Sequence, residues 1–227
     1  MNFNKKIRTV AVFGGSGFIG RYIVTELLKE DYLVRVFCRN PYKAKHLALL
    51  GRLGQVEIHQ CNIMDASKVD NCISKVNKVI NLVGVLEEKN KQSFINIHLK
   101  GAINIARACS KNNISSFIHF SALGLYDGEH SKYANSKLEA ENNIKSIFKN
   151  AIIFRPSVVF GPEDNFTNKF AQMASISPFM PLINSGKTNF QPVYVKDIAK
   201  AARLVLKSKS FNGKVYNLGG PEILNFK

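Results

Sequence analysis

The chain has 227 residues, of which 45% are hydrophobic and 21% charged; this composition excludes disordered and collagen-like proteins and predicts one globular domain with at most a small appendage. Its longest apolar stretch, residues 151–160, contains an arginine and a proline and is too short for a membrane-spanning helix, which argues against an integral membrane protein. The formal net charge of +16 fits an acidic protein partner or an anionic membrane surface, and the alternative source is the codon bias of an AT-rich genome, which enriches Lys, Asn and Ile. Nucleic acid is disfavoured because no lysine run exceeds Lys5-Lys6.

Strands and helices alternate along most of the chain. Short apolar runs predict strands at residues 7–13, 33–38, 56–59, 78–83, 117–120 and 152–154. Amphipathic segments predict helices at residues 18–30, 41–50, 92–111, 131–148, 166–173 and 195–206. This order predicts an α/β fold, a Rossmann-type doubly wound parallel sheet. We expect residues 1–156 to form a dinucleotide-binding domain and residues 157–227 a partial C-terminal lobe whose strands and helices return to the Rossmann core.

A glycine-rich turn follows the first predicted strand. Gly14, Gly17 and Gly20 have the spacing G-x-x-G-x-x-G and stand between a buried strand and a helix. Such glycines let the backbone approach a pyrophosphate closely, and the helix that follows offers free N–H groups and the positive end of its dipole. The alternative is a turn that only packs the helix on the strand, but the strand–turn–helix context favours phosphate binding.

Arg39 stands at the end of the second predicted strand, where NAD-binding proteins usually carry Asp or Glu for the ribose hydroxyls. A guanidinium group can grip a 2′-phosphate with two hydrogen bonds. We therefore expect NADP(H) to be preferred over NAD(H). The alternative is a surface arginine that merely ends the strand.

Tyr133 and Lys137 are four residues apart and share one face of a predicted helix. A tyrosine acts as an acid or base near neutral pH only if its pKa falls well below its usual value, and a nearby ammonium group favours this. Ser121, at the end of the fifth predicted strand, is placed to hold a carbonyl or hydroxyl of a substrate. We predict that these three residues are catalytic, the alternative being a solvated helix face.

Cysteine and histidine spacing predicts no metal site. The four cysteines form no C-x-x-C pair and the five histidines no H-x-x-x-H pair. Residues 1–8 lack the apolar run of a secretory signal, so we expect a cytoplasmic protein, with any transit peptide absent or already removed.

These motifs together resemble the short-chain dehydrogenase/reductases of the extended or atypical kind. The resemblance covers the chain from Val10 to about Phe226. It rests on the glycine turn, Ser121, Tyr133 with Lys137, and three further strings: NLVG at 81–84, RPSVVFG at 155–161 and VYVKD at 193–197.

Four strings are similar to a narrower family, the nucleotide-binding accessory subunits of respiratory complex I and their bacterial relatives. They are residues 81–85, 155–164, 168–171 and 190–195. This resemblance implies a tightly held NADPH and partnership with subunits of NADH:ubiquinone oxidoreductase. It also implies a peripheral position on the inner face of the bacterial inner membrane, or on the matrix side if the protein is organellar.

The resemblance also implies a role for each site residue. Those expected to cradle the pyrophosphate are Gly14, Ser16, Gly17, Phe18, Ile19 and Gly20. Arg39 would take the 2′-phosphate, Asn62 and Ile63 would flank the adenine, and Val83 and Gly84 would lie along the ribose. Tyr133 and Lys137 would bond the nicotinamide ribose, and Pro156, Ser157 and Val158 would border the nicotinamide.

Three departures from the family pattern matter. Asn62 replaces the usual Asp at the adenine edge, although its amide can still donate and accept hydrogen bonds. His98 replaces an Asn that supports a water-mediated proton relay in active reductases. The chain ends at Lys227, where relatives continue, so we expect an incomplete substrate pocket.

Three functions follow from these observations. The first is an NADPH-binding accessory or assembly component of NADH:ubiquinone oxidoreductase. The second is an active NADP-dependent reductase or epimerase that acts on a small carbonyl or nucleotide-sugar substrate through Tyr133 and Lys137. The third, less favoured, is a redox sensor that binds NADP(H) without chemistry.

Overall fold

Seven parallel strands form the main sheet of the computed structural model, which describes residues 8–90, 92–126, 131–164, 167–168, 175 and 189–225. The strands are β1 (Arg8–Phe13), β2 (Tyr32–Cys38), β3 (Val56–Gln60), β4 (Lys78–Asn81), β5 (Ser116–Phe120), β6 (Ile152–Pro156) and β9 (Val215–Leu218). Their spatial order is β3-β2-β1-β4-β5-β6-β9, so the direction in which strands are added reverses between β1 and β4. The predicted doubly wound parallel sheet is confirmed.

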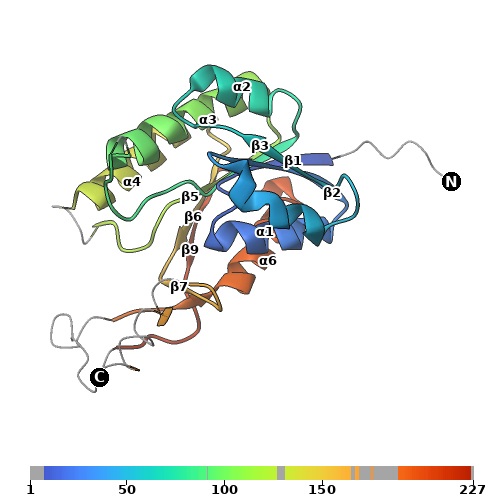
Figure 1. The fold of residues 1–227 in the computed structure, drawn as a ribbon. Coiled ribbons are helices and arrows are strands. Elements are labelled where there is room, and N and C mark those ends of the chain that lie inside the picture. Colours follow the sequence, from blue (N-terminus) through green and yellow to red (C-terminus); the bar gives the residue numbers. More distant parts are fainter. Residues whose placement is uncertain are drawn as a thin grey trace.

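Helices cover both faces of this sheet (Figure 1). On one face lie α1 (Phe18–Leu28) and α6 (Val195–Val205), with the 3₁₀-helix η1 (Pro41–Leu50) packed beside β3 and α1. On the other lie α2 (Ala66–Ile73), α3 (Gly101–Lys111) and α4 (Lys132–Ile147), with the short π-helix η2 (Ile95–Lys100) leading into α3. A 3₁₀ turn, η5 (Lys209–Phe211), precedes β9.

The central strand β1 explains why the core has two parts. Val10 and Val12 point into the cluster beneath α1 and α6, whereas Ala11 and Phe13 point into the cluster beneath α2, α3 and α4. All four side chains are fully buried. A strand covered on both faces must be apolar at successive positions, which is why this segment reads as a continuous hydrophobic run.

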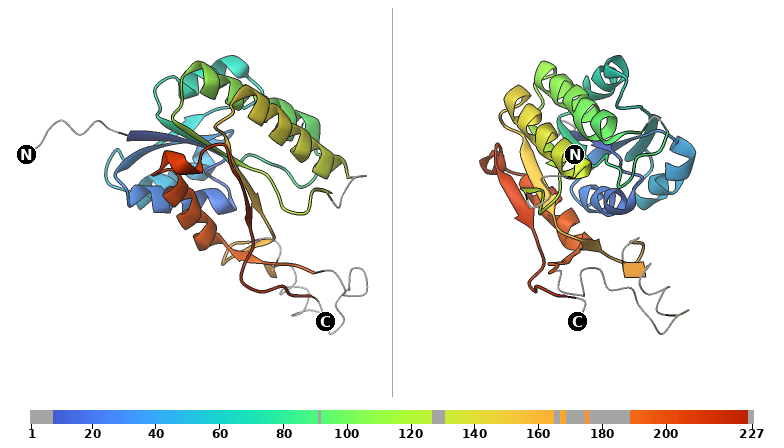
Figure 2. Two further views of the ribbon diagram at one scale, coloured as in Figure 1. Left: turned by 180° about the vertical axis from the view of Figure 1, so that it is seen from behind. Right: turned by 90° about the vertical axis from the view of Figure 1, so that its left-hand side faces the viewer.

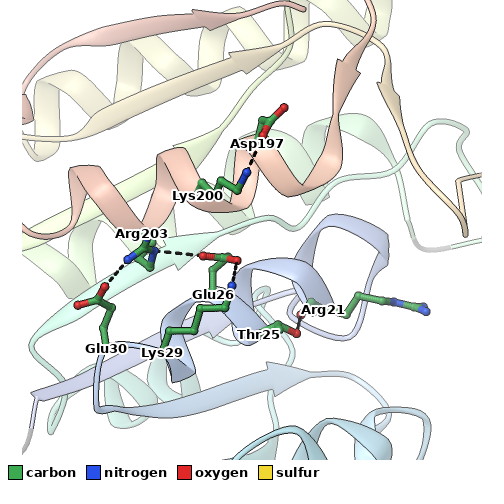
Figure 3. Close-up of polar contacts among 8 residues, drawn as sticks. All are labelled: Arg21, Thr25, Glu26, Lys29, Glu30, Asp197, Lys200 and Arg203. Atoms are coloured by element: carbon green, nitrogen blue, oxygen red, sulfur yellow. Dashed lines mark hydrogen bonds and ion pairs between the residues drawn. The ribbon is translucent and has the colours of Figure 1, made fainter.

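Two carboxylates, on Glu26 of α1 and on Glu30 just beyond the end of α1, hold α6 in place (Figure 3). The Arg203 guanidinium lies 3.1 Å from Glu26 Oε2 and also pairs with Glu30. Glu26 additionally pairs with Lys29, one turn along the same helix. Helix α6 comes from the C-terminal part of the chain, so these ion pairs join it to the N-terminal glycine-turn helix.

The C-terminal part of the chain also contributes strands. In Figure 2, β9 lies along β6 at the edge of the main sheet, and their register pairs Ile153 with Val215. A second, two-stranded sheet joins β7 (Val159–Phe160) to β8 (Val193–Tyr194). The described residues after 157 therefore both extend the main sheet and build a small separate layer.

The structure explains why two of the predicted elements have different ends from those expected. The expected strand 78–83 ends at Asn81, because the Asn81 side-chain carbonyl accepts the Val83 N–H at 3.1 Å and turns the chain. The expected helix 92–111 starts later, since Gln92 pairs with Lys89 in an isolated antiparallel bridge. Helix α2 was not predicted, and β7, β8 and β9 were expected only as strands of the C-terminal lobe, without assigned residues. The helix expected at 166–173 lies mostly outside the described residues.

Within the ranges that the structure describes, no helix has the length and apolarity needed to cross a membrane.

Candidate functional site

A cavity of about 920 Å³ opens at the carboxyl ends of the strands, beside the point where strand order reverses. It brings together most of the predicted site residues. Those lining it are Gly14, Gly17, Phe18, Ile19, Gly20, Gly84, Ser121, Tyr133, Lys137, Pro156, Ser157 and Val158. The other predicted residues, Ser16, Arg39, Asn62, Ile63 and Val83, are not part of its lining.

The glycine turn has the geometry of an anion cradle. Gly14 adopts φ +79°, and its carbonyl accepts the Gly17 N–H at 3.0 Å. A Cβ on Gly20 would lie 2.5 Å from the Gly14 carbonyl oxygen, so only glycine fits there. Gly17 precedes α1 without a side-chain cap, and the first turn of α1 contains no acidic residue. The amides at the start of α1 are therefore free to bind a phosphate.

Arg39 and Asn62 follow the neighbouring strands β2 and β3 at the same edge of the sheet as the cavity. Both side chains are exposed, and Arg39 forms no ion pair with any residue in the described part of the chain. The Asn62 side-chain oxygen accepts the Met64 N–H at 3.1 Å, which leaves its NH₂ group available as a donor. A ligand that extends from the cavity across the ends of β1 and β2 would meet the Arg39 side chain.

Three predicted residues are held by their neighbours at this edge. The Ser16 hydroxyl contacts the Cys38 thiol, whose pKa is raised mainly by burial. Ile63 is buried, and its carbonyl accepts a hydrogen bond from Asn104 Nδ2 at 2.9 Å. Val83 is half-buried after β4, with its N–H bonded to the Asn81 side chain. These contacts fix the loops that border the cavity.

Helix α4 presents Tyr133 and Lys137 to the cavity. Its N-cap is Ser131, whose side chain accepts the Ala134 N–H. Lys137 Nζ lies 6.0 Å from the centre of the Tyr133 ring and donates to the Phe120 carbonyl at 3.2 Å. A Cβ on Gly84 would lie 3.3 Å from Lys137 Nζ, so the loop after β4 packs against the Lys137 ammonium group.

Burial sets the protonation behaviour of this pair. It lowers the pKa of Lys137 to about 8, although Glu141, one turn further along α4, favours the charged form. Burial raises the pKa of Tyr133 above its ordinary value. Tyr133 is therefore protonated at neutral pH, and its loss of a proton would require additional positive charge in the cavity.

Ser121 follows β5 and lines the cavity next to Tyr133 and Lys137. Its hydroxyl is buried, and none of the described residues provides a hydrogen-bond partner for it. A buried hydroxyl without a partner is costly, so this group is placed to bond a ligand.

His98 lies behind Tyr133 and uses both of its ring nitrogens. Nε2 accepts the Val85 N–H at 3.0 Å, and Nδ1 lies 2.9 Å from Ser136 Oγ. The Ser136 hydroxyl donates to the Tyr133 carbonyl at 2.7 Å, so Nδ1 of His98 must carry the proton and donate to Ser136. Burial, with a contribution from the Lys137 charge, lowers the pKa of His98 to about 4 and keeps the ring neutral.

Aromatic packing holds Tyr133 in position. Its ring meets those of His98 and Phe94 edge-on, with centroid separations of 5.2 and 5.6 Å. Phe94 in turn stacks on His98 at 5.3 Å. The sequence indicated His98 but contained no signal for this cluster, because Phe94 and His98 lie at or in η2 whereas Tyr133 lies on α4.

Sequence reasoning missed the outer wall of the cavity. Phe190 and Gln191 line it together with Ile223, and Phe190 is bonded to Leu224 through an isolated antiparallel bridge. Asp164 also lines the cavity and accepts the Gly161 N–H at 3.0 Å. Gly161 and Asp164 lie in the string 155–164, but nothing in the pattern places Phe190 opposite them.

Among the described residues, no cluster of three or more His, Cys, Asp or Glu could hold a metal ion. The cavity residues instead suit an elongated anionic ligand. One part of the cavity is lined by the glycine turn and the free amides at the start of α1. Another part is lined by the unpartnered Ser121 hydroxyl and by Tyr133 with Lys137. The residues therefore fit a dinucleotide.

Comparisons with known proteins match this arrangement. The chain is 36% identical over 215 residues to the mitochondrial NADH dehydrogenase (ubiquinone) 1 alpha subcomplex subunit 9 of Arabidopsis thaliana, covering 93% of this chain and 54% of that protein. It is 35% identical over 213 residues to the Mus musculus protein of the same name, covering 92% and 56%. The chain thus spans about half the length of these curated relatives.

A solved structure with the same fold is that of Pal from Bacillus thuringiensis, with a TM-score of 0.81 and 22% identity, covering 96% of this chain and 80% of that one. The family model described as NAD dependent epimerase/dehydratase family matches residues 10–219. The resemblances noted in the sequence, to extended short-chain dehydrogenase/reductases and to the complex I subunit, are confirmed. With the parallel sheet, the glycine turn and the Tyr–Lys pair in place, the chain belongs to the NAD dependent epimerase/dehydratase family.

Proposed function

We propose that this protein is an accessory or assembly component of NADH:ubiquinone oxidoreductase that holds NADPH as a retained ligand. The names of the relatives that are 35 and 36% identical over most of the chain support the association. The family match and the glycine cradle support binding of a nicotinamide dinucleotide. Because the chain spans only part of those relatives, its place in such a complex is a proposal.

The chain has a group for each part of the ligand. Amides at the start of α1 would bind the pyrophosphate, and Arg39 would pair with the 2′-phosphate. Tyr133 and Lys137 would bond the nicotinamide ribose, with Pro156–Val158 beside the ring. When bound, NADPH supplies a hydride at its nicotinamide. The preference for NADPH over NADH rests on Arg39, which stands where an acidic residue would accept ribose hydroxyls.

The hydrogen bonding of His98 is the observation that carries the proposal. A reductase must return a proton to its tyrosine after each turnover, and in related reductases an asparagine at this position supports the relay. Here the neutral imidazole is fully engaged by Val85 and Ser136, and its pKa of about 4 prevents it from accepting a proton at neutral pH. The geometry therefore favours retention of the nucleotide over turnover.

A second function is supported by Ser121. Its unpartnered hydroxyl faces the cavity beside Tyr133 and Lys137, which is the arrangement that a reductase or epimerase needs to hold a carbonyl group. In this alternative the protein acts on a small carbonyl or nucleotide-sugar substrate. Tyr133 would then donate or accept the proton, and Lys137 would stabilise its charged form.

The first experiment follows the tagged protein in its own cells. Gently solubilised membranes are run on a native gel stained for NADH dehydrogenase activity, and nucleotide released from the purified protein is identified by chromatography. We expect co-migration with the large activity band and near-stoichiometric NADPH. A protein that migrates alone and carries no nucleotide would contradict the proposal.

Two variants separate binding from chemistry. Gly17→Ala removes space at the phosphate cradle, and we expect it to lower both bound NADPH and the amount of assembled activity band. Tyr133→Phe removes only the hydroxyl, and we expect the assembled band to persist. If a substrate screen instead finds an NADPH oxidation that Tyr133→Phe abolishes, the reductase function replaces the accessory one.

A further inference from the structure

The segment between β2 and β3 exposes leucines and lysines together. Helix η1 has a three-residue repeat in which only Ala44 and Leu47 are buried, so the other two rows of side chains face solvent. Leu49 is 86% exposed, and Leu53, in the turn that follows, is fully exposed. The exposed side chains that form this 42–53 surface are Tyr42, Lys43, Lys45, Leu49, Leu50 and Leu53.

The charge of this segment is entirely positive. No Asp or Glu occurs between Asp31 and Glu57. Arg35 pairs with Glu57 and Arg52 with Asp31, but Lys43 and Lys45 have no ion pair with any residue in the described ranges. The Lys45 ammonium lies 3.7 Å from the centre of the Tyr42 ring, which holds the cation over an aromatic side chain.

The leucine end of the surface lies away from the cavity. A Cβ on Gly51 would lie 3.1 Å from Leu28, the last residue of α1, and Arg52 pairs with Asp31 just beyond that helix. Helix α1 begins at the cavity edge of the sheet, so its end and the 49–53 turn lie at the opposite edge, where β3 begins. A substitution in this turn can therefore leave the glycine cradle intact.

We infer that the 42–53 surface docks on a lipid bilayer that contains anionic headgroups. Exposed leucines and a tyrosine flanked by unpaired lysines form the composition of segments that lie in the membrane interface, with apolar side chains among the acyl chains and ammonium groups at the phosphates. The cores of protein–protein interfaces are depleted in lysine, which favours a lipid over a protein partner. The net charge of +16 adds attraction to an anionic surface.

This docking would orient the molecule. Because η1 runs from the carboxyl end of β2 to the start of β3, it would lie along the headgroup layer, with the β3 edge of the sheet toward the lipid and the cavity opening to the side. The nucleotide site would then stay open to solvent or to a partner subunit. Docking of this surface on lipid requires neither a particular partner subunit nor a preference for NADPH.

Vesicle sedimentation with the full chain tests this inference. The probes are vesicles of phosphatidylcholine alone and of phosphatidylcholine mixed in equal parts with phosphatidylglycerol. We expect salt-sensitive binding to the mixed vesicles and about a tenfold lower partition coefficient for the double variant Leu49→Ser/Leu53→Ser. Ile95→Ser is the matched control, because Ile95 is 54% exposed on η2, over the opposite face of the sheet from η1, and its loss should leave partitioning unchanged.

Nucleotide binding and the melting temperature serve as readouts of folding for each variant. No binding by the parent protein would overturn the inference. Binding that responds to salt but not to Leu49→Ser/Leu53→Ser would show a diffuse electrostatic attraction, and that result also overturns it. If the double variant keeps vesicle binding but loses co-migration with the activity band, the surface contacts a protein and the lipid assignment is wrong.

Discussion

His98 Nδ1 donates a 2.9 Å hydrogen bond to Ser136 Oγ, and through it the π-helix before α3 is joined to α4. Because the Ser136 hydroxyl donates a hydrogen bond to the Tyr133 carbonyl, the backbone that carries the site tyrosine is part of the same network. The other nitrogen of His98 accepts the Val85 N–H, so the loop after β4 is fixed as well. One neutral imidazole thus connects three segments around the cavity.

This network predicts a pH dependence of stability. Burial lowers the pKa of His98 from 6.5 to about 4 in the folded protein, so between these values the unfolded chain binds a proton that the folded one does not. The free energy of unfolding therefore falls as pH decreases through this window. Relative to His98→Gln, which cannot titrate, the loss should be about 3 kcal/mol. Urea unfolding of both proteins near pH 7 and near pH 4 measures it, and a constant difference would contradict the assignment.

Arg39 is expected to set the nucleotide preference. The exposed guanidinium has no ion pair in the described structure, so its full donor set is available to a 2′-phosphate. We expect NADPH to bind more tightly than NADH, and Arg39→Ala to weaken NADPH alone by about 1.5–3 kcal/mol. Titration calorimetry measures both ligands. Arg52→Ala, which breaks a surface pair with Asp31, is the control and should change neither affinity. Equal affinities in the parent protein would refute the role of Arg39.

Two glycines of the turn, Gly17 and Gly20, should respond differently to alanine. A Cβ on Gly20 would lie 2.5 Å from the Gly14 oxygen and 2.6 Å from the Gly15 Cα, both backbone atoms, so the turn must shift. We expect Gly20→Ala to lower the free energy of unfolding by about 1–3 kcal/mol. Gly17 has φ −78°, and a Cβ there would meet only the Gly14 oxygen, at 3.3 Å. Gly17→Ala should keep the melting temperature nearly unchanged while weakening nucleotide binding. Equal loss of stability in both variants would contradict this account.

The ion pair between Arg155 and Glu141 should make a large contribution to stability, so that the effects of substituting its two members on the free energy of unfolding are not additive. Arg155 Nη2 lies 2.6 Å from Glu141 Oε2, and the Glu141 side chain is only 2% exposed. Glu141→Gln leaves a largely buried guanidinium without its counter-charge, and we expect a loss of about 3 kcal/mol in the free energy of unfolding. The double variant Glu141→Leu/Arg155→Met should lose less, because it leaves no buried guanidinium group unpaired. Chemical denaturation of both variants tests this, and a larger loss in the double variant would show that packing dominates.

The sequence predicted the sheet well because its signal is local. Strand β1 is apolar at successive positions, and the glycine spacing after it can be recognised without any knowledge of tertiary contacts. The predicted strand 78–83 was too long because the side chain of Asn81 turns the chain, a contact that hydrophobicity does not encode. Helix α2 was missed because it is only eight residues long and has little hydrophobic content.

What the sequence by itself determined is the alternation of strands with helices, the glycine-rich turn after the first strand, and the spacing of Tyr133 and Lys137 on one helix. The tertiary structure decided which of these features share a cavity, that Phe190 and Ile223 close it, and that both nitrogens of His98 are occupied. Arg39 depends on both kinds of information. Its residue type favours a 2′-phosphate, and the strand order, with β2 beside β1, puts it at the same edge of the sheet as the glycine turn. The physical reason is that periodicity and turn chemistry act over a few residues, whereas burial, pKa and hydrogen-bond partners depend on groups brought together from distant parts of the chain.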